Sequence, residues 1–134
     1  MTPRGIRNNN PLNIRHSASK WQGRAPRQTD PSFVQFTSMA YGYRAAFVLL
    51  RTYRMKYGCD TIRKIIERWA PRNENNTDTY IAHVASWSGI GADRRIAGQD
   101  ANTYISIVCA MSRQENGQEA NRAVVAEGWR LSNI

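Results

Sequence analysis

Long apolar runs and cysteines are scarce in this sequence. No window approaches the length of a membrane-spanning helix, and the first ten residues, MTPRGIRNNN, lack the apolar stretch of a secretory signal peptide. We therefore expect a protein that is made in the cytoplasm and does not insert into a membrane. The two cysteines, Cys59 and Cys109, are not spaced as a metal-binding or redox pair, so we expect small core side chains rather than a disulfide.

The motifs of several enzyme classes are also absent. His16 and His83 have no companions at the spacing of a metal site, so no metal is expected. No serine or cysteine lies in a recognised nucleophile motif. The stretch GIGAD, residues 89–93, lacks the glycine pattern of a phosphate-binding loop. The sequence therefore predicts no cofactor.

Acidic residues are few: there are 10, against 19 lysines and arginines, which gives a formal net charge of +9. Such a surface attracts polyanions, and both nucleic acid and the anionic bacterial cell wall are candidates. The basic residues are spread along the chain without forming a block. This argues against a nucleic-acid-binding tail but leaves a folded basic face open. We expect no specific nucleic-acid partner.

The chain has the length of one domain, residues 1–134, with no repeat or linker. Residues 1–36 are rich in asparagine, proline, glycine and serine, which predicts an irregular lobe. Within it, SFVQF at residues 32–36 alternates like a short strand, and WQG at residues 21–23 has the composition of a turn. Helical periodicity dominates the rest. The predicted fold class is mainly α with a small N-terminal irregular or β-hairpin lobe.

Caps and apolar spacing predict the helices. In each of them, apolar residues recur at intervals of three and four and would face a common core. We expect Asp60 to cap the second helix and Trp87 to lie on the inner face of the third. The predicted spans are about 38–57, 61–70, 77–87, 101–115 and 118–130.

Glu115 closes the fourth predicted helix. It follows Val108 by seven residues and Tyr104 by eleven, so it returns to the buried face. Asn116 and Gly117 then end the helix. A carboxyl at the edge of a core is desolvated and lies at the negative end of the helix dipole, and both effects favour the protonated form that a general acid needs. The alternative is an ordinary helix-end glutamate paired with an arginine.

Two stretches resemble the lytic transglycosylases and goose-type lysozymes. AMSRQENG, residues 110–117, is similar to the end of their catalytic helix, which implies Glu115 as the acid, with asparagine replacing the usual serine. TDTYIAHV, residues 77–84, resembles the helix whose tyrosine packs beside that acid, which implies this role for Tyr80. The family's preceding glutamate is replaced by Asn76. Without the resemblance, Tyr80 would be interpreted as a core tyrosine.

A third stretch, NNNPLNIR at residues 8–15, together with KWQG and FVQF, resembles the asparagine-rich strand and Trp-rich hairpin of bacterial glucosaminidases with a lysozyme-like fold. Amide side chains in an irregular segment suit recognition of N-acetyl sugars, and a tryptophan offers a stacking face for a pyranose ring. The alternative is an ordinary turn rich in asparagine and proline. The substrate-binding candidates are Asn9, Asn10, Asn13, Trp21 and Gln22.

The order of these stretches differs from the order in those families, where the acid-bearing helix comes first and the tyrosine helix last. Here the asparagine-rich segment is first and Glu115 is last, so the resemblance implies a circularly permuted lysozyme-like domain. GIRNNNP, residues 5–11, also resembles the start of small lysozyme-like or virion structural proteins of bacteriophages. The leading alternative is therefore a virion protein that keeps the fold without activity.

The resemblance implies an enzyme, either a peptidoglycan lytic transglycosylase or a muramidase, with Glu115 as general acid on the β-1,4 glycan backbone. A transglycosylase needs one carboxylate, because the C6 hydroxyl of the substrate attacks. Hydrolysis usually needs a second carboxylate, for which Asp30 and Glu74 are candidates, although each is also an ordinary loop residue. The expected partner is bacterial peptidoglycan. The protein would be made in the bacterial host, remain monomeric unless assembled in a virion, and act on the cell wall.

Overall fold

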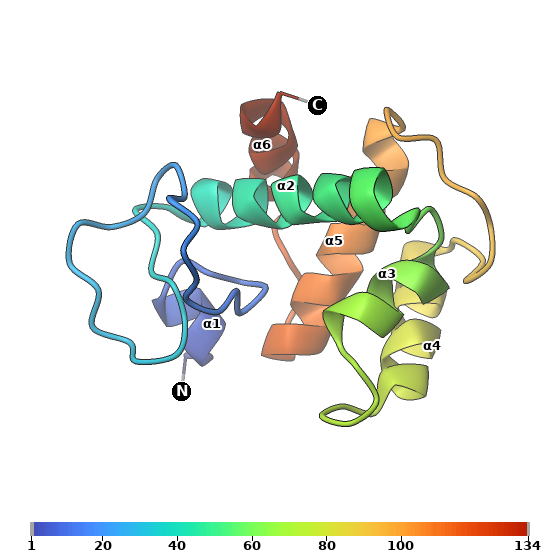
Figure 1. The fold of residues 1–134 in the computed structure, drawn as a ribbon, viewed down its shortest axis with the longest axis horizontal. Helices are drawn as coiled ribbons and strands as arrows, with labels where there is room; N and C mark the ends of the chain where they lie inside the picture. Colours follow the sequence, from blue (N-terminus) through green and yellow to red (C-terminus); the bar gives the residue numbers. More distant parts are fainter. Residues whose placement is uncertain (1, 134) are drawn as a thin grey trace.

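Helices dominate the computed structural model, which describes residues 2–133 (Figure 1). The short helix α1, Arg4–Arg7, lies in the N-terminal segment, and the predicted mainly α fold class is confirmed. The longer helices are α2, Met39–Tyr57; α3, Ile62–Trp69; α4, Thr77–Ser88; α5, Ala101–Asn116; and α6, Arg122–Ser132.

The core surrounds α5. This helix packs against α1, α2, α4 and α6, and its buried face carries Ile107, Val108 and Met111. The most extensive pairing joins α2 to α6, where the ring of Phe47 meets Trp129 edge-on with centroids 5.2 Å apart. In Figure 1, α2 runs across α5, and α3 and α4 lie together on one side of it. Burial of these apolar faces is the main force holding the helices together.

Local signals fix the ends of the two central helices. The Ser38 hydroxyl caps α2 by accepting from the Tyr41 amide, and Gly58 stops it in the left-handed conformation at φ 64°. Asp100 caps α5, and Gly117 stops it in the same way at φ 69°. These stops match the predicted ends of both helices. Glu115 therefore lies in the last turn of α5.

The predicted cap of α3 is wrong. Thr61, not Asp60, accepts from the Lys64 amide at the start of this helix. The carboxylate of Asp60 instead accepts from the Lys64 ammonium at 3.1 Å and from Arg95 at 3.2 Å. The Asp60 carboxylate thus binds two cations instead of the helix amides, and the neighbouring threonine caps the helix.

The predictions for Trp87 and for the last helix also need correction. Trp87 is exposed rather than inward-facing, with 37% of its surface accessible, and it stacks on His83 at a centroid distance of 4.6 Å. α6 begins at Arg122, later than predicted, because the Asn121 side chain caps it by accepting from the amides of Ala123 and Val124.

The N-terminal lobe, residues 2–37, is held together differently. Two isolated bridges, Arg15 with Phe33 and Arg24 with Phe36, replace the short strand that was predicted at residues 32–36. The turn at residues 21–23 is present, with Gly23 at φ 77°. The lobe contains α1, and Figure 1 places it on the side of α5 away from α3 and α4.

Three simpler features complete the fold. Cys59 and Cys109 are both free, as expected, and Cys59 is buried. No helix within residues 2–133 is long and apolar enough to cross a membrane. The same residues contain no group of three or more His, Cys, Asp or Glu side chains that could hold a metal ion.

Candidate active site

A cavity of about 530 Å³ opens at the C-terminal end of α5. One wall belongs to the N-terminal lobe and includes Asn13 and Arg15. The other wall is the end of α3 and the loop after it, with Trp69 and Glu74. Glu115 also lines the cavity, and Figure 1 shows the end of α5 pointing between the two sides. We call this cavity the cleft; its position places a helix-end carboxyl between two separate parts of the chain.

Each oxygen of Glu115 accepts a hydrogen bond, one from each side of the molecule. The Tyr80 hydroxyl, from α4, donates to Oε2 at 2.9 Å. The Asn13 amide, from the N-terminal lobe, donates to Oε1 at 2.9 Å. The carboxyl is thus fixed in orientation. The structure brings together Glu115, Tyr80 and one of the asparagines that the resemblance had singled out.

Burial sets the protonation of this group. It raises the pKa of the Glu115 carboxyl above the ordinary glutamate value, although the hydrogen bonds from Asn13, Tyr80 and Trp69 partly offset the shift because they stabilise the ionised form. Burial, together with the charge of Glu115, raises the pKa of Tyr80 well above the ordinary tyrosine value. Tyr80 therefore stays protonated and remains a donor, while Glu115 holds its proton to a higher pH than an ordinary glutamate.

Asn13 is held in place by the chain around it. Its backbone has a positive φ of 54°, in the left-handed region that asparagine tolerates better than most residues. The preceding turn is fixed by Asn10, which is fully buried and donates to the carbonyls of Ile14 and Val34. Asn116, the last residue of α5, donates to the carbonyl of Pro11 at 2.8 Å. The turn carrying Asn13 is therefore docked onto the same helix end that carries Glu115.

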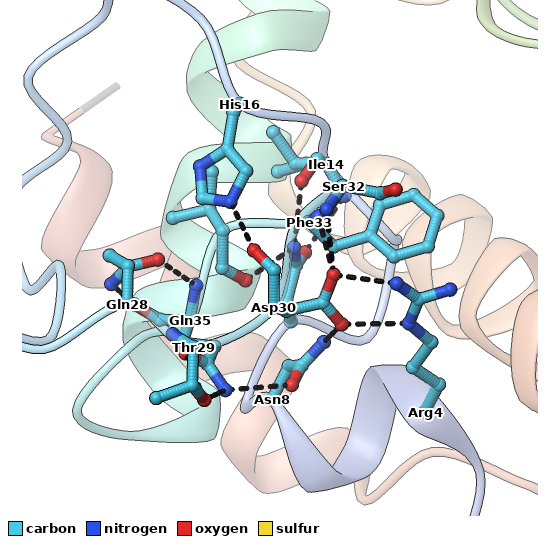
Figure 2. A network of polar contacts seen from close by, with 12 residues as sticks. Arg4, Asn8, Ile14, His16, Gln28, Thr29, Asp30, Ser32, Phe33 and Gln35 are labelled. Carbon is cyan, nitrogen blue, oxygen red and sulfur yellow. Dashed lines mark hydrogen bonds and ion pairs between the residues drawn. The ribbon is translucent and has the colours of Figure 1, made fainter.

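Asp30, the first candidate for a second carboxylate, has a different task. Figure 2 shows it at the centre of a polar network, where it accepts from the Arg4 guanidinium at 2.6 and 2.7 Å and from the Asn8 amide at 2.9 Å. The backbone amides of Ser32 and Phe33 donate to it as well, at 2.8 and 2.9 Å.

These contacts leave Asp30 little freedom for chemistry. Its side chain is 8% exposed, and the Arg4 guanidinium holds the pKa of the carboxyl far below its usual range. Asp30 is not among the residues that line the cleft. We interpret it as the clamp that closes the N-terminal lobe rather than as a base or nucleophile.

Glu74, the second candidate, does line the cleft. It is exposed, and it lies in the loop between α3 and α4, where its amide donates to the Pro71 carbonyl at 3.1 Å. It therefore faces the same space as Glu115 from the wall opposite Asn13. Of the two candidates, Glu74 is the one that lines the same cleft as Glu115.

Of the remaining substrate-binding candidates, some bind the backbone of the lobe and the others lie at the surface or line a cavity. Asn9 donates to the Phe36 carbonyl at 3.1 Å and, like Asn10, serves the backbone of the lobe. Gln22 is exposed and lines neither the cleft nor the cavity beside it. Trp21 lines that neighbouring cavity, which has a volume of about 290 Å³. Of these residues, Asn13 and Trp21 face space that a ligand could occupy.

Several residues important for the cleft were missed. Trp69 was not singled out for function, yet it lines the cleft while also packing against the core. Gly5 begins the GIRNNNP stretch but was given no role of its own. A Cβ there would lie 2.6 Å from Asn116 Oδ1 and 3.0 Å from Asn13 Oδ1, so a glycine is needed where the N-terminal lobe meets α5. Arg15 ends the NNNPLNIR stretch, and its position there was the signal that could have found it.

The comparison with known proteins gives one clear relationship. Over 117 residues the chain is 42% identical to Protein P5 of Pseudoalteromonas phage PM2, and the alignment covers 85% of this chain and 71% of that protein. The chain belongs to the Protein P5 family. No family model matches the chain. The name Protein P5 states no activity, so the relationship supports the expected bacteriophage kinship and leaves the glycosidase prediction untested.

Proposed function

We propose that this phage-type protein is a glycosidase that cleaves the β-1,4 glycan backbone of bacterial peptidoglycan, with Glu115 as the general acid. The observation that carries the proposal is the position of Glu115: a desolvated carboxyl with raised pKa, oriented by Asn13 and Tyr80, at the edge of a cleft. A carboxyl whose pKa is raised in this way holds its proton to a higher pH than an ordinary glutamate and can transfer it to a bound leaving group.

The first step follows from this geometry. Glu115 gives its proton to the glycosidic oxygen as the bond from that oxygen to C1 breaks. The resulting carboxylate is stabilised by the hydrogen bonds from Asn13 and Tyr80. The high pKa of Tyr80 keeps its hydroxyl proton available as a donor to this carboxylate.

The second step has two routes. In a transglycosylase, the substrate's C6 hydroxyl attacks C1, its proton passes to Glu115, and an anhydro-sugar is formed. In a hydrolase, water supplies the new oxygen on C1. The second carboxylate either accepts a proton from the attacking water or bonds to C1 first and is then displaced by water, and we propose Glu74, which lines the cleft, for this role. Asp30 takes part in neither route, because Arg4 and the lobe backbone occupy it.

The second candidate function is a virion structural protein without activity. The relationship to a phage protein bears more directly on this alternative than on catalysis, because it supports a phage role and names no reaction. In that case the contacts of Glu115 with Asn13 and Tyr80 would tie the N-terminal lobe to the helices and do nothing else.

Digestion of purified peptidoglycan, followed by mass spectrometry of the muropeptides, separates these functions. We expect anhydro products from a transglycosylase and reducing-end products from a muramidase. Glu115→Gln keeps the shape of the side chain but removes its transferable proton, so the rate should fall by about 10² or more. The matched control is Glu119→Gln, at an exposed position outside the cleft, which should cleave at the wild-type rate. Wild-type protein that releases no product would reject the enzyme and favour the virion role.

A further inference from the structure

The cleft continues into the neighbouring cavity. Both are lined by Asn13, Arg15 and Trp69, so the two spaces meet along these residues. The chemistry changes along this path. Glu74 and Glu115 line the cleft, whereas Trp21 and Tyr53 line the neighbouring cavity, which we call the aromatic cavity. Aromatic faces beside polar groups form a surface on which sugar rings stack.

Arg15 stands where the two spaces meet. Its side chain is exposed, and its guanidinium lies over the ring of Phe33, 5.3 Å from the centroid. The Arg4 guanidinium also lies over this ring, 4.6 Å from the centroid, but Arg4 is paired with Asp30. The ring of Phe33 gives the Arg15 guanidinium a platform that favours one orientation.

Arg15 differs from Arg4 in having no acidic partner. None of the ion pairs within residues 2–133 includes it, although Glu74 and Glu115 line the same cleft. Among the described residues, Arg15 is also the one cation that lines either the cleft or the aromatic cavity. A planar guanidinium held over a ring at the edge of a binding space is suited to bidentate binding of a carboxylate.

We infer that Arg15 binds a carboxylate carried by the substrate glycan and thereby selects an acidic amino-sugar polymer over a neutral one. The inference rests on the proposed function. In peptidoglycan, alternate sugars carry a lactyl ether. Its carboxyl is a free carboxylate where no peptide is attached, and elsewhere it is joined by an amide bond to a peptide that has carboxylates of its own. A glycan threaded from the cleft into the aromatic cavity would pass Arg15 with these substituents.

The test combines a change in the protein with a change in the substrate. Cleavage and co-sedimentation are measured on intact peptidoglycan and on peptidoglycan whose carboxyls have been amidated. We expect Arg15→Gln to lower kcat/KM on the intact polymer by about tenfold, the scale of one charge-assisted contact that is partly exposed, mainly through KM. Amidation of the polymer should lower the kcat/KM of the wild type by a similar factor. It should leave the kcat/KM of Arg15→Gln unchanged, since this variant has already lost the same contact.

Two further arms make the result specific. Arg27→Gln removes one exposed positive charge from the same lobe, away from both spaces, and should behave as wild type on every substrate. Glycan strands stripped of peptide carry only the lactyl carboxylates that cleavage of the amide sets free. On these strands, a persisting effect of Arg15→Gln shows that Arg15 binds the lactyl carboxylate, and a vanished effect assigns the contact to the carboxylates of the peptide.

The inference and the proposed function can fail separately. Suppose that the wild type cleaves. If Arg15→Gln then lowers kcat/KM by the same factor on intact and amidated polymer, or does not lower it at all, Arg15 does not bind a carboxylate. If the wild type cleaves nothing, the proposed activity is wrong, and co-sedimentation still decides the binding. Equal sedimentation of wild type and Arg15→Gln with the intact polymer would overturn the inference in that case.

Discussion

The N-terminal lobe and the helical part of this molecule are stabilised in different ways. The helices bury a continuous set of apolar side chains, including Phe47, Ile107 and Met111. The lobe contributes few apolar residues. It is closed by asparagine and glutamine side chains that donate to backbone carbonyls and by the Asp30 carboxylate, which accepts from backbone amides. Apolar packing tolerates small changes in geometry, whereas each polar contact depends on specific partners. We therefore expect the two parts to respond differently to mutation.

The largest expected effect on stability is in the helical part. Phe47→Ala removes a fully buried ring that packs on Trp129, and it should lower the free energy of unfolding by about 3–5 kcal/mol, the usual cost of such a cavity. Urea denaturation followed by circular dichroism measures the change. Because α2 and α6 share this contact, both helices should unfold in the same transition. A loss below about 1 kcal/mol would show that the helices do not depend on this packing.

The second effect should be confined to the lobe. Asp30→Asn removes the charge that pairs with Arg4, and an amide cannot accept the five hydrogen bonds that Asp30 receives. Amide hydrogen exchange should become faster in residues 2–37, while α2 and α5 keep their protection. Asp93→Asn is the control, since Asp93 pairs with Arg63 on the exposed surface. Uniform loss of protection along the whole chain would contradict the separation of the two parts.

This prediction has a pH dependence with a definite sign. The folded-state pKa of Asp30 is depressed, so its stabilising contribution is present above the unfolded-state pKa of about 3.9 and is lost as pH falls through the folded value. Wild-type protection of the lobe should therefore weaken with acidification below about pH 5. Asp30→Asn should lack that dependence.

The smallest effect lies where the two parts meet, at Glu115. Tyr80→Phe removes a donor to the carboxylate, which should raise the pKa of Glu115 further. A general acid loses activity as pH rises through its pKa, so the alkaline limb of the pH–rate profile should move to higher pH. The rate at the optimum should fall by about tenfold or less, the scale of one hydrogen bond to a charged group.

Tyr43→Phe is a matched control for this experiment. Its buried hydroxyl bonds to Ser112, one turn before Glu115 on α5, and does not reach the carboxyl. Tyr43→Phe should alter the free energy of unfolding without shifting the alkaline limb of the pH–rate profile. An unmoved limb in Tyr80→Phe would show that Tyr80 packs beside Glu115 without tuning it.

The contrast between the two parts also explains how far the sequence could be interpreted. Caps and three-to-four spacing are local signals, so the predicted ends of α2 and α5 lie within one residue of the observed ends. Local signals fail where a distant charge competes. Asp60 was assigned as a cap, but Arg95 lies thirty-five positions away in the sequence and binds its carboxylate.

The candidate site shows the same limit. Glu115 and Tyr80 were placed together by resemblance, and the structure sets them 2.9 Å apart, although their catalytic roles stay predictions. The partnership of Asp30 with Arg4 spans twenty-six positions with no periodic pattern, so nothing in the sequence distinguished a structural clamp from a second catalytic carboxylate. Short polar contacts between irregular segments have no sequence period to reveal them.

The hydrogen bond from Asn13 to Glu115 joins residues separated by 102 positions. During synthesis the N-terminal segment leaves the ribosome long before its docking surface exists, by about 5–20 s at ordinary elongation rates of roughly 5–20 residues per second. Contacts of such long range also form late in folding, because they close a large loop. The cleft therefore cannot assemble before Glu115 has been made, and any activity it has begins only when the first residues have returned to that glutamate.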